Sequence, residues 1–401
     1  MRKICCFVSA AVVALLLASC LRIGDGNPYT SDLHQLSIIL MAPDGELPDY
    51  SLSEISVKDI NTDADYQAVC DVSGHAVLDV PNGLYMVMAS ILNGEHSFNG
   101  NQSGIVVSGA AADCIVSLSS LKLSDIVIKE IYCGGCLKYP QEGKYQTDSY
   151  FILHNNSAST VYLDGLCFGT LDPYNSNSTS VWENDIDFAP IIQAVWQFPG
   201  DGDDYPLEKG QDAVVAVYGA IDHSAHYPLS VNLDREDVFV CYNPTYFPNT
   251  SYHPAPGPHI QLDHYLDVVI KTGQSNAYTF SVNSPALVIF RAVGTTIQDF
   301  VSKSDNVIQK PGSEKDKVVC VPNEWILDGV EVFNGESSSN KKRIAPAIDA
   351  SYITLSKSFE GHTLMRRVDE TKSSKMGFEV LQDTNNSSKD FYERETQSLH
   401  K

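Results

Sequence analysis

Residues 74–87 have the sequence GHAVLDVPNGLYMV. Two apolar runs, one ending at Val80 and one beginning at Leu84, flank a Pro-Asn-Gly segment. Asn82-Gly83 is a strong turn signal between strands, and a strand places every second side chain on the same face. The stretch therefore predicts a β-hairpin in which Tyr85 and Val87 point to one side of the sheet.

Similar short apolar runs continue in both directions from this stretch. They lie at 36–40, 55–57, 76–80, 85–89 and 105–107, and Gly, Pro, Asn and Asp separate them. Short alternating strands with frequent turn signals are typical of antiparallel sandwiches. No convincing amphipathic helix is present, so we predict an all-β fold whose first β-sandwich covers residues 33–122.

A second set of strands follows a boundary near Lys122. Runs at 126–132, 150–157 and 161–166 open it, and runs at 326–331 and 364–367 close it. We predict a second β-sandwich over residues 123–401, with an insertion at about 168–320. The insertion contains further strands and Pro- and Tyr-rich loops, and long loops on a rigid sandwich are common places for binding.

The N-terminus has the order of a signal peptide: basic Arg2 and Lys3, an apolar run over 4–17, then small residues. The apolar run is shorter than the ~20 residues that a membrane-spanning helix needs. Leu17-Ala18-Ser19-Cys20 resembles a bacterial lipobox, which implies cleavage after residue 19 and lipid on the Cys20 thiol. We predict a signal peptide at 1–19 and a lipidated tether at 20–32; an ordinary secretory signal is the alternative.

Composition restricts the partners. The chain has 401 residues, with 27 basic and 50 acidic side chains and a net charge of −23. Loss of Arg2 and Lys3 with the signal peptide makes the mature charge −25. Such an acidic protein is a poor ligand for nucleic acid or for an anionic membrane surface. The lipid anchor is therefore the expected contact with the membrane.

Four cysteines are candidates for disulfides, since the predicted compartment is oxidising. Cys133-Gly134-Gly135-Cys136 predicts a structural disulfide in a tight loop; a redox pair or half of a zinc site are the alternatives. Cys70 and Cys114 lie in the first predicted sandwich and are a candidate bridge between its sheets.

Two groups in the predicted insertion are candidate binding residues. Five histidines lie close in sequence, and imidazole is a common ligand of transition metals, so capture of iron, haem or another metal is an alternative to surface histidines. Four aromatic residues among prolines suit contact with a sugar or a partner protein, or packing of their own loop. The histidines are His223, His226, His253, His259 and His264, and the aromatic residues are Tyr242, Tyr246, Phe247 and Tyr252.

Three segments carry resemblances to known families. Residues 74–87 resemble the G-x-A-x-x-x-V-P-x-G-x-Y-x-V segment of transthyretin-like or carboxypeptidase-regulatory-like domains. The run at 126–132, the segment Ile152-Leu153-His154-Asn155 and Leu163-Asp164-Gly165-Leu166 resemble the opening of a lamin-tail-like domain, which implies an immunoglobulin-like sandwich. The segment 381–391, LQDTNNSSKDF, together with the YPLEKG segment at 205–210, resembles an uncharacterised family of Bacteroides-type envelope lipoproteins.

The expected function is non-catalytic binding or assembly at the cell envelope. No nucleophile elbow, phosphate-binding loop or dinucleotide fingerprint is present, so we expect no enzyme, no catalytic residue and no cofactor. The resemblance implies an outer-membrane lipoprotein that faces the periplasm or the surface, with an outer-membrane uptake transporter or a glycan as partner. A metal- or haem-capture lipoprotein and a glycan-acting hydrolase are the alternatives.

Mass spectrometry of the mature N-terminus tests the anchor. We expect the first residue to be Cys20 with lipid on its thiol, because the lipobox implies cleavage after residue 19. Several acyl chains hold a protein on a membrane stably, whereas one does not. An unmodified mature terminus would contradict the lipobox.

Overall fold

The computed structural model describes residues 32–182 and 186–400. Strands in several sheets dominate these residues and the helices are short, which confirms the predicted all-β fold. Within the described ranges, no helix is long and apolar enough to cross a membrane. The predicted signal peptide, Cys20 and the tether up to residue 31 lie outside the described residues.

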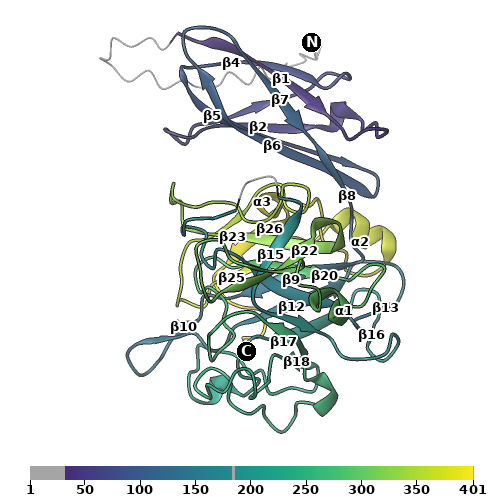
Figure 1. The fold of residues 1–401 in the computed structure, drawn as a ribbon, viewed down its shortest axis with the longest axis vertical. Coiled ribbons are helices and arrows are strands. Elements are labelled where there is room, and N and C mark those ends of the chain that lie inside the picture. Colours follow the sequence, from purple (N-terminus) through teal and green to yellow (C-terminus); the bar gives the residue numbers. More distant parts are fainter. Residues whose placement is uncertain (1–31, 183–185, 401) are drawn as a thin grey trace, which may run out of the picture.

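Residues 34–122 form a first module of two sheets, at the top of Figure 1. The smaller sheet has the order β4-β1-β7: β4 (His75–Val80), β1 (His34–Met41) and β7 (Ala112–Ser117). The larger sheet has the order β3-β2-β5-β6-β8: β3 (Asp65–Ala68), β2 (Glu54–Asp59), β5 (Gly83–Asn93), β6 (His96–Val107) and β8 (Ser119–Lys122). The 3-10 turn η1 (Tyr50–Leu52) precedes β2.

Alternation along the strands builds the core of this module. Leu36, Ile38 and Leu40 of β1 are buried against Tyr85 and Val87 of β5 in a single apolar cluster. The prediction that Tyr85 and Val87 share a face is confirmed, since both are 0% exposed.

The predicted hairpin around Asn82-Gly83 is wrong. β4 pairs with β1, whereas β5 pairs with β2 and β6, so the turn carries the chain from one sheet to the other. Gly83 does not have the positive φ that a type I′ hairpin turn requires. The Asn82 side chain instead accepts a hydrogen bond of 2.7 Å from the Gly109 amide.

The second module follows β8 and contains two larger sheets. One has the order β18-β17-β12-β9-β25-β26: β18 (Val238–Val240), β17 (Asp212–Ala216), β12 (Tyr150–Asn155), β9 (Ile126–Tyr132), β25 (Thr363–Arg366) and β26 (Phe391–Arg394). The other has the order β21-β22-β15-β14-β20-β23-β24, and β19 also pairs with β15: β21 (Val307–Gln309), β22 (Lys317–Pro322), β15 (Phe188–Gln197), β14 (Cys167–Leu171), β20 (Ala286–Phe290), β23 (Ile326–Asn334), β24 (Ile353–Leu355) and β19 (Asp267–Lys271).

The residues predicted as an insertion, 168–320, are part of both sheets. They supply β17 and β18 to the first sheet and β15, β20 and most of β22 to the second. The structure therefore does not set them apart as an appended layer, because β17, β15 and β20 lie at internal positions of the two sheets.

Short elements complete the second module. Two ribbons are β10 (Cys136–Leu137) with β11 (Lys144–Tyr145), and β13 (Val161–Tyr162) with β16 (Pro206–Leu207). The helices are α1 (Ile297–Val301), α2 (Glu370–Met376) and α3 (Ser387–Asp390), with 3-10 turns η2 (His223–Ala225), η3 (Leu262–His264) and η4 (Asn323–Trp325).

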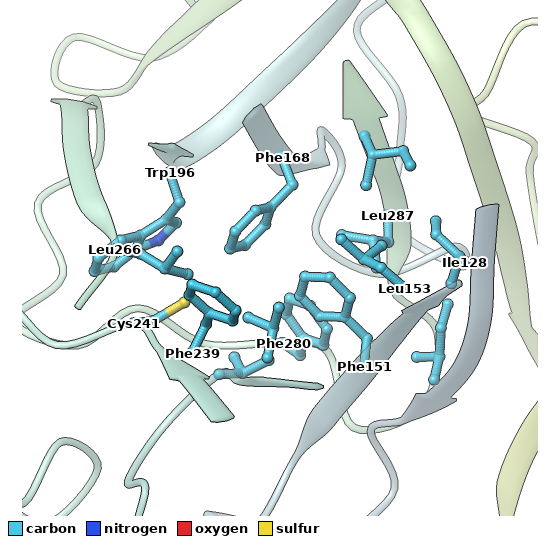
Figure 2. Close-up of a cluster of buried hydrophobic side chains, with 14 of the residues drawn as sticks. Ile128, Phe151, Leu153, Phe168, Trp196, Phe239, Cys241, Leu266, Phe280 and Leu287 are labelled. Atoms are coloured by element: carbon cyan, nitrogen blue, oxygen red, sulfur yellow. The ribbon is translucent and has the colours of Figure 1, made fainter. Parts of the chain in front are cut away.

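Aromatic rings fill the space between the two large sheets (Figure 2). Phe151 of β12 lies edge-on to Phe168 of β14, with ring centroids 5.0 Å apart, and stacks on Phe280 at 6.2 Å. Trp196 of β15 is completely buried. Side chains of this size contribute roughly 1.5–3 kcal/mol each on burial, so this cluster is the main apolar core of the second module.

A buried arginine links the two large sheets. Arg366 on β25 is 2% exposed and donates to Asp328 of β23 at 2.5 Å and to Asp383 at 3.1 Å. The Asp390 carboxylate lies 3.6 Å from the same guanidinium. The Ile128 amide also donates to Asp328, at 2.6 Å. Burial raises the pKa of Asp328 to about 7 and that of Asp390 to about 6, although Arg366 favours their charged forms.

These raised pKa values predict a contribution to stability that falls with increasing pH. The folded protein holds protons on Asp328 and Asp390 at pH values where the unfolded chain has released them. The contribution of each group to the free energy of unfolding should therefore fall by up to about 1.4 kcal/mol per pH unit as pH rises from roughly 4 to the folded pKa, whereas the lowered pKa values of the buried His223 and His253 add a slope of opposite sign below about pH 6.5. Urea unfolding at pH 5, 6, 7 and 8 measures this slope.

Asp328→Asn, which cannot titrate, should remove one negative term and so make the slope less negative, and Asp44→Asn, at an exposed loop position, should leave it unchanged. A slope in Asp328→Asn equal to that of the unsubstituted protein would contradict the assignment.

Candidate functional site

One face of the larger sheet of the first module carries buried polar side chains. Ser97 and Asn99 on β6 are 0% exposed, and Ser90, which pairs with Asn99 across β5 and β6, is 7% exposed. Polar groups are seldom buried without hydrogen-bond partners. This face is turned toward the second module (Figure 1), which supplies partners to two of these side chains.

Asn385 joins the two modules. The side-chain amide of Asn385 donates to the Ser97 hydroxyl at 2.7 Å. The backbone carbonyl of Asn385 accepts from the Asn99 side chain at 3.3 Å and from the Ala350 amide at 2.7 Å. Asn385 has φ of 52°, in the left-handed region that asparagine adopts more readily than most residues.

The segment around Asn385 is held by its own polar residues. Thr384 donates to Asp390 from both its amide and its hydroxyl, each at 2.9 Å. Ser387 donates in the same way to Asp349, at 2.8 and 2.6 Å. Lys389 reaches Glu54 of the first module, 2.5 Å away. The segment 383–391 is therefore the junction between the modules.

Beside this junction the two modules line an open cavity of about 390 Å³. Ligand sites in proteins commonly have volumes of roughly 300–1,000 Å³ and are lined by apolar groups with a few polar ones. Both modules contribute side chains to the lining. The first contributes Lys58, Met86, Met88 and Asn101, and the second contributes Trp182, Phe188, Phe333 and Tyr352.

The aromatic rings at the cavity are fixed in pairs. Phe333 and Tyr352 stack with ring centroids 3.9 Å apart and an interplanar angle of 14°. Trp182 lies edge-on to Phe188 at 5.8 Å, and its indole nitrogen donates to Asp172 at 2.9 Å. Rings held in this way lose little further freedom when a ligand binds.

Several charges that line the cavity are already matched by partners. Arg343 pairs with Glu331 at 2.6 Å, and both side chains are almost completely buried. Lys342 donates to two backbone carbonyls, those of Asp349 at 2.7 Å and Ser351 at 2.6 Å. Lys58 lies 3.2 Å from Asp63.

The structure does not contain the predicted disulfides. Cys133, Cys136, Cys70 and Cys114 are all buried, free thiols. Cys133 packs between the large sheets, whereas Cys136 lies 3.5 Å from the Asp148 carboxylate, so the two thiols have different surroundings. Burial raises the pKa of both to about 12, which disfavours the reactive thiolate of a redox pair.

The structure also corrects the predicted cysteine bridge of the first module. Cys70 and Cys114 belong to the same apolar core but remain unbonded. Burial raises the pKa of Cys114 to about 11 and also raises that of Cys70.

The five histidines do not converge on a metal site. His223 lies against Tyr145 and the Gly219 carbonyl, and His253 against the carbonyls of Cys241 and Tyr278. The remaining three are separate: His259 pairs with Asp234, His264 stacks on Phe239, and His226 is exposed. Burial lowers the pKa of His223 and His253, and the hydrogen bond that the His259 ring donates to the Asp234 carboxylate raises the pKa of His259.

In the part of the chain that the structure describes, no group of three His, Cys, Asp or Glu side chains has the arrangement of a metal site. The five histidines are close in sequence only, because those that are bonded contact backbone carbonyls or side chains at separate places.

The four predicted aromatic residues mostly stabilise their own loop. Phe247 is 1% exposed and stacks on Trp196 at 5.7 Å. Tyr252 packs on Tyr218, and Tyr242 on Tyr265. Tyr246 is 42% exposed. None of the four is among the residues that line the cavity.

Sequence reasoning missed the residues of the cavity. Met86 and Met88 carry a recognisable signal, since they are apolar but alternate with Tyr85 and Val87, which fill the core. Apolar side chains on the outer face of a strand indicate a second contact surface. No local pattern connects them with Trp182 or Tyr352, which come from the other module.

The fold and cavity define a two-module, all-β protein with a candidate ligand site between the modules. Residues 208–398 match the family described as "Protein of unknown function (DUF4876)". A DUF4876 family protein from Bacteroides thetaiotaomicron, known from its crystal structure, is 25% identical, with a TM-score of 0.59 over 89% of this chain and 94% of that chain. These matches support the predicted resemblance to an uncharacterised family.

A second solved structure is the T6 backbone pilin of Streptococcus pyogenes, with 8% identity over 82% of this chain and 98% of that chain. Its TM-score of 0.17 is too low to support any inference. No curated protein matches the sequence.

Asn385→Gly tests the junction. Glycine accepts the positive φ, so the substitution removes the side-chain contact with Ser97 and leaves the backbone conformation accessible. Loss of a hydrogen bond that leaves a buried partner unsatisfied costs about 1–3 kcal/mol, so amide hydrogen exchange at residues 97–101 should become about tenfold faster or more. Asn82→Gly, within the first module, is the matched control. Unchanged protection at 97–101 in Asn385→Gly would show that Asn385 does not hold the modules together.

Proposed function

We propose that this protein is a lipid-anchored, non-catalytic binding protein of the bacterial cell envelope, and that the cavity between its modules is the ligand site. The observation that supports this proposal most strongly is the lining of the cavity. Both modules contribute to it, its rings are fixed in pairs, and Lys58, Lys342 and Arg343 already have partners.

A non-catalytic role fits the use of the buried ionisable groups. Arg366 and its three carboxylates link the sheets, and the Arg343–Glu331 pair orders the chain around β23. Asp148 Oδ2 accepts from the hydroxyls of Tyr132 and Ser230, its buried Oδ1 has no hydrogen-bond partner among the described residues, and burial raises its pKa. The two arginine groups have structural partners, so a role in holding the fold accounts for them.

The sequence supplies the proposed location. The lipobox ending at Cys20 supports attachment to the outer membrane, with the body facing the periplasm or the surface. A tethered protein with a ligand site between its modules suits a role as an accessory of an outer-membrane uptake system. The transporter of that system would receive the ligand from this protein. The metal- or haem-capture and glycan-hydrolase alternatives gain no specific support from the geometry.

Filling the cavity tests the proposal. Met88 points away from the core of the first module and lines the cavity, so Met88→Trp should occupy the ligand volume while the sheet remains intact. Protein gently extracted from the envelope of its own cells should carry a small-molecule adduct in native mass spectrometry, and Met88→Trp should lose it.

Tyr246→Ala, an exposed aromatic residue outside the cavity, should keep the adduct, and the midpoint of thermal unfolding checks that Met88→Trp is folded. The absence of any adduct on the unsubstituted protein, or an adduct that survives in Met88→Trp, would refute the cavity as the ligand site.

A further inference from the structure

We propose that the ligand of this cavity is an uncharged oligosaccharide. This inference rests on the proposed function, since it names the class of molecule that the cavity would bind. Three properties of the lining support it: most of its charged side chains already have polar partners, the aromatic rings are fixed, and a polar side chain lies beside an apolar one on the wall from the first module.

The partners of the less exposed charges argue against an ionic ligand. Arg343 is occupied by Glu331, Lys342 by two carbonyls, and Asp172 by Lys310 at 2.7 Å. Recognition of a carboxylate or phosphate normally uses an available cation, and breaking a buried pair to free one is unfavourable. The exposed residues Glu336 and Lys341 also line the cavity and carry opposite charges. The lining thus offers no concentrated charge of either sign.

The apolar groups demand a ligand with an apolar face. Phe333 with Tyr352 and Trp182 with Phe188 form two fixed aromatic pairs, and Met88 adds a polarisable thioether on the opposite module. The negative face of an aromatic ring attracts the slightly positive hydrogens of C–H groups. A pyranose ring presents such C–H groups on its faces.

The polar groups demand hydrogen bonds from the same ligand. Asn101 is directly opposite Met88 in the pairing of β5 and β6, so an amide and a thioether lie side by side on the wall. Among the described residues, the half-buried Asn101 side chain makes no hydrogen bond, and the exposed Ser103 lies two residues further along β6. Sugar hydroxyls, which both donate and accept, match an amide in this position. A purely aliphatic ligand would leave that amide unpaired.

Calorimetric titration of the mature lipoprotein in detergent tests the ligand class. The probes are an array of neutral tetrasaccharides of glucose, galactose, mannose and N-acetylglucosamine, with tetragalacturonate as an anionic oligosaccharide of equal length. At least one neutral probe should bind with a Kd of 1 mM or tighter, roughly −4 kcal/mol by the standard conversion, and tetragalacturonate at least about tenfold more weakly.

Variants locate the binding. Asn101→Ala should weaken the neutral probe by about fivefold, as expected for one lost hydrogen bond. Met88→Trp should abolish binding, and Tyr246→Ala should leave the Kd unchanged. Emission of Trp182 provides a second readout, because the chain has three tryptophans and the other two, Trp196 and Trp325, are buried.

Three outcomes would overturn the inference: no neutral probe binds, tetragalacturonate binds as tightly, or binding persists in Met88→Trp. The outcomes also separate the ligand class from the proposed function. If Met88→Trp loses a native adduct but no neutral probe binds, the cavity is a ligand site for another class of molecule. If neither adduct nor probe depends on Met88, both proposals fail.

Discussion

The structure of the second module depends on one buried cation and the carboxylates around it. Arg366 contacts Asp328 on the opposite sheet and Asp383 at the start of the junction segment, and Asp390 lies at the end of that segment. Removal of one partner from such a group leaves an uncompensated buried charge, which typically costs 3–5 kcal/mol. The cluster therefore determines where both sheets and the segment 383–391 lie relative to one another.

That constraint extends to the first module. Because Asp383 and Asp390 are held by Arg366, the residues between them are fixed as a tight loop, and Asn385 is presented at its tip with a positive φ. Ser97 and Asn99 can then make their hydrogen bonds with Asn385 only if the first module sits at one place on the second. The cavity next to this contact takes its shape from the same placement, since its two walls belong to different modules.

Local patterns predicted the strands well and their partners poorly. Alternation identified β4 and β5 and the shared face of Tyr85 and Val87, because side-chain direction along a strand is a local property. It misassigned the pairing of β4 and β5, since a turn signal does not say which sheet the next strand enters. The candidate cysteines and, apart from the exposed His226, the candidate histidines proved to be buried or separately bonded, because their surroundings come from distant parts of the chain.

The segment 381–391, which carries the most specific part of the family resemblance, has a structural role. Its polar residues bond to Arg366, to Asp349 and to the first module, so they are needed for structure. A ligand that touches both walls of the cavity would nevertheless depend on them. If the ligand binds more tightly when the two modules are in contact, then contact between the modules must, by thermodynamic linkage, increase the affinity for the ligand. Residues of the junction can therefore influence affinity without touching the ligand, and a distinctive sequence segment and a ligand site can be coupled while lying in different places.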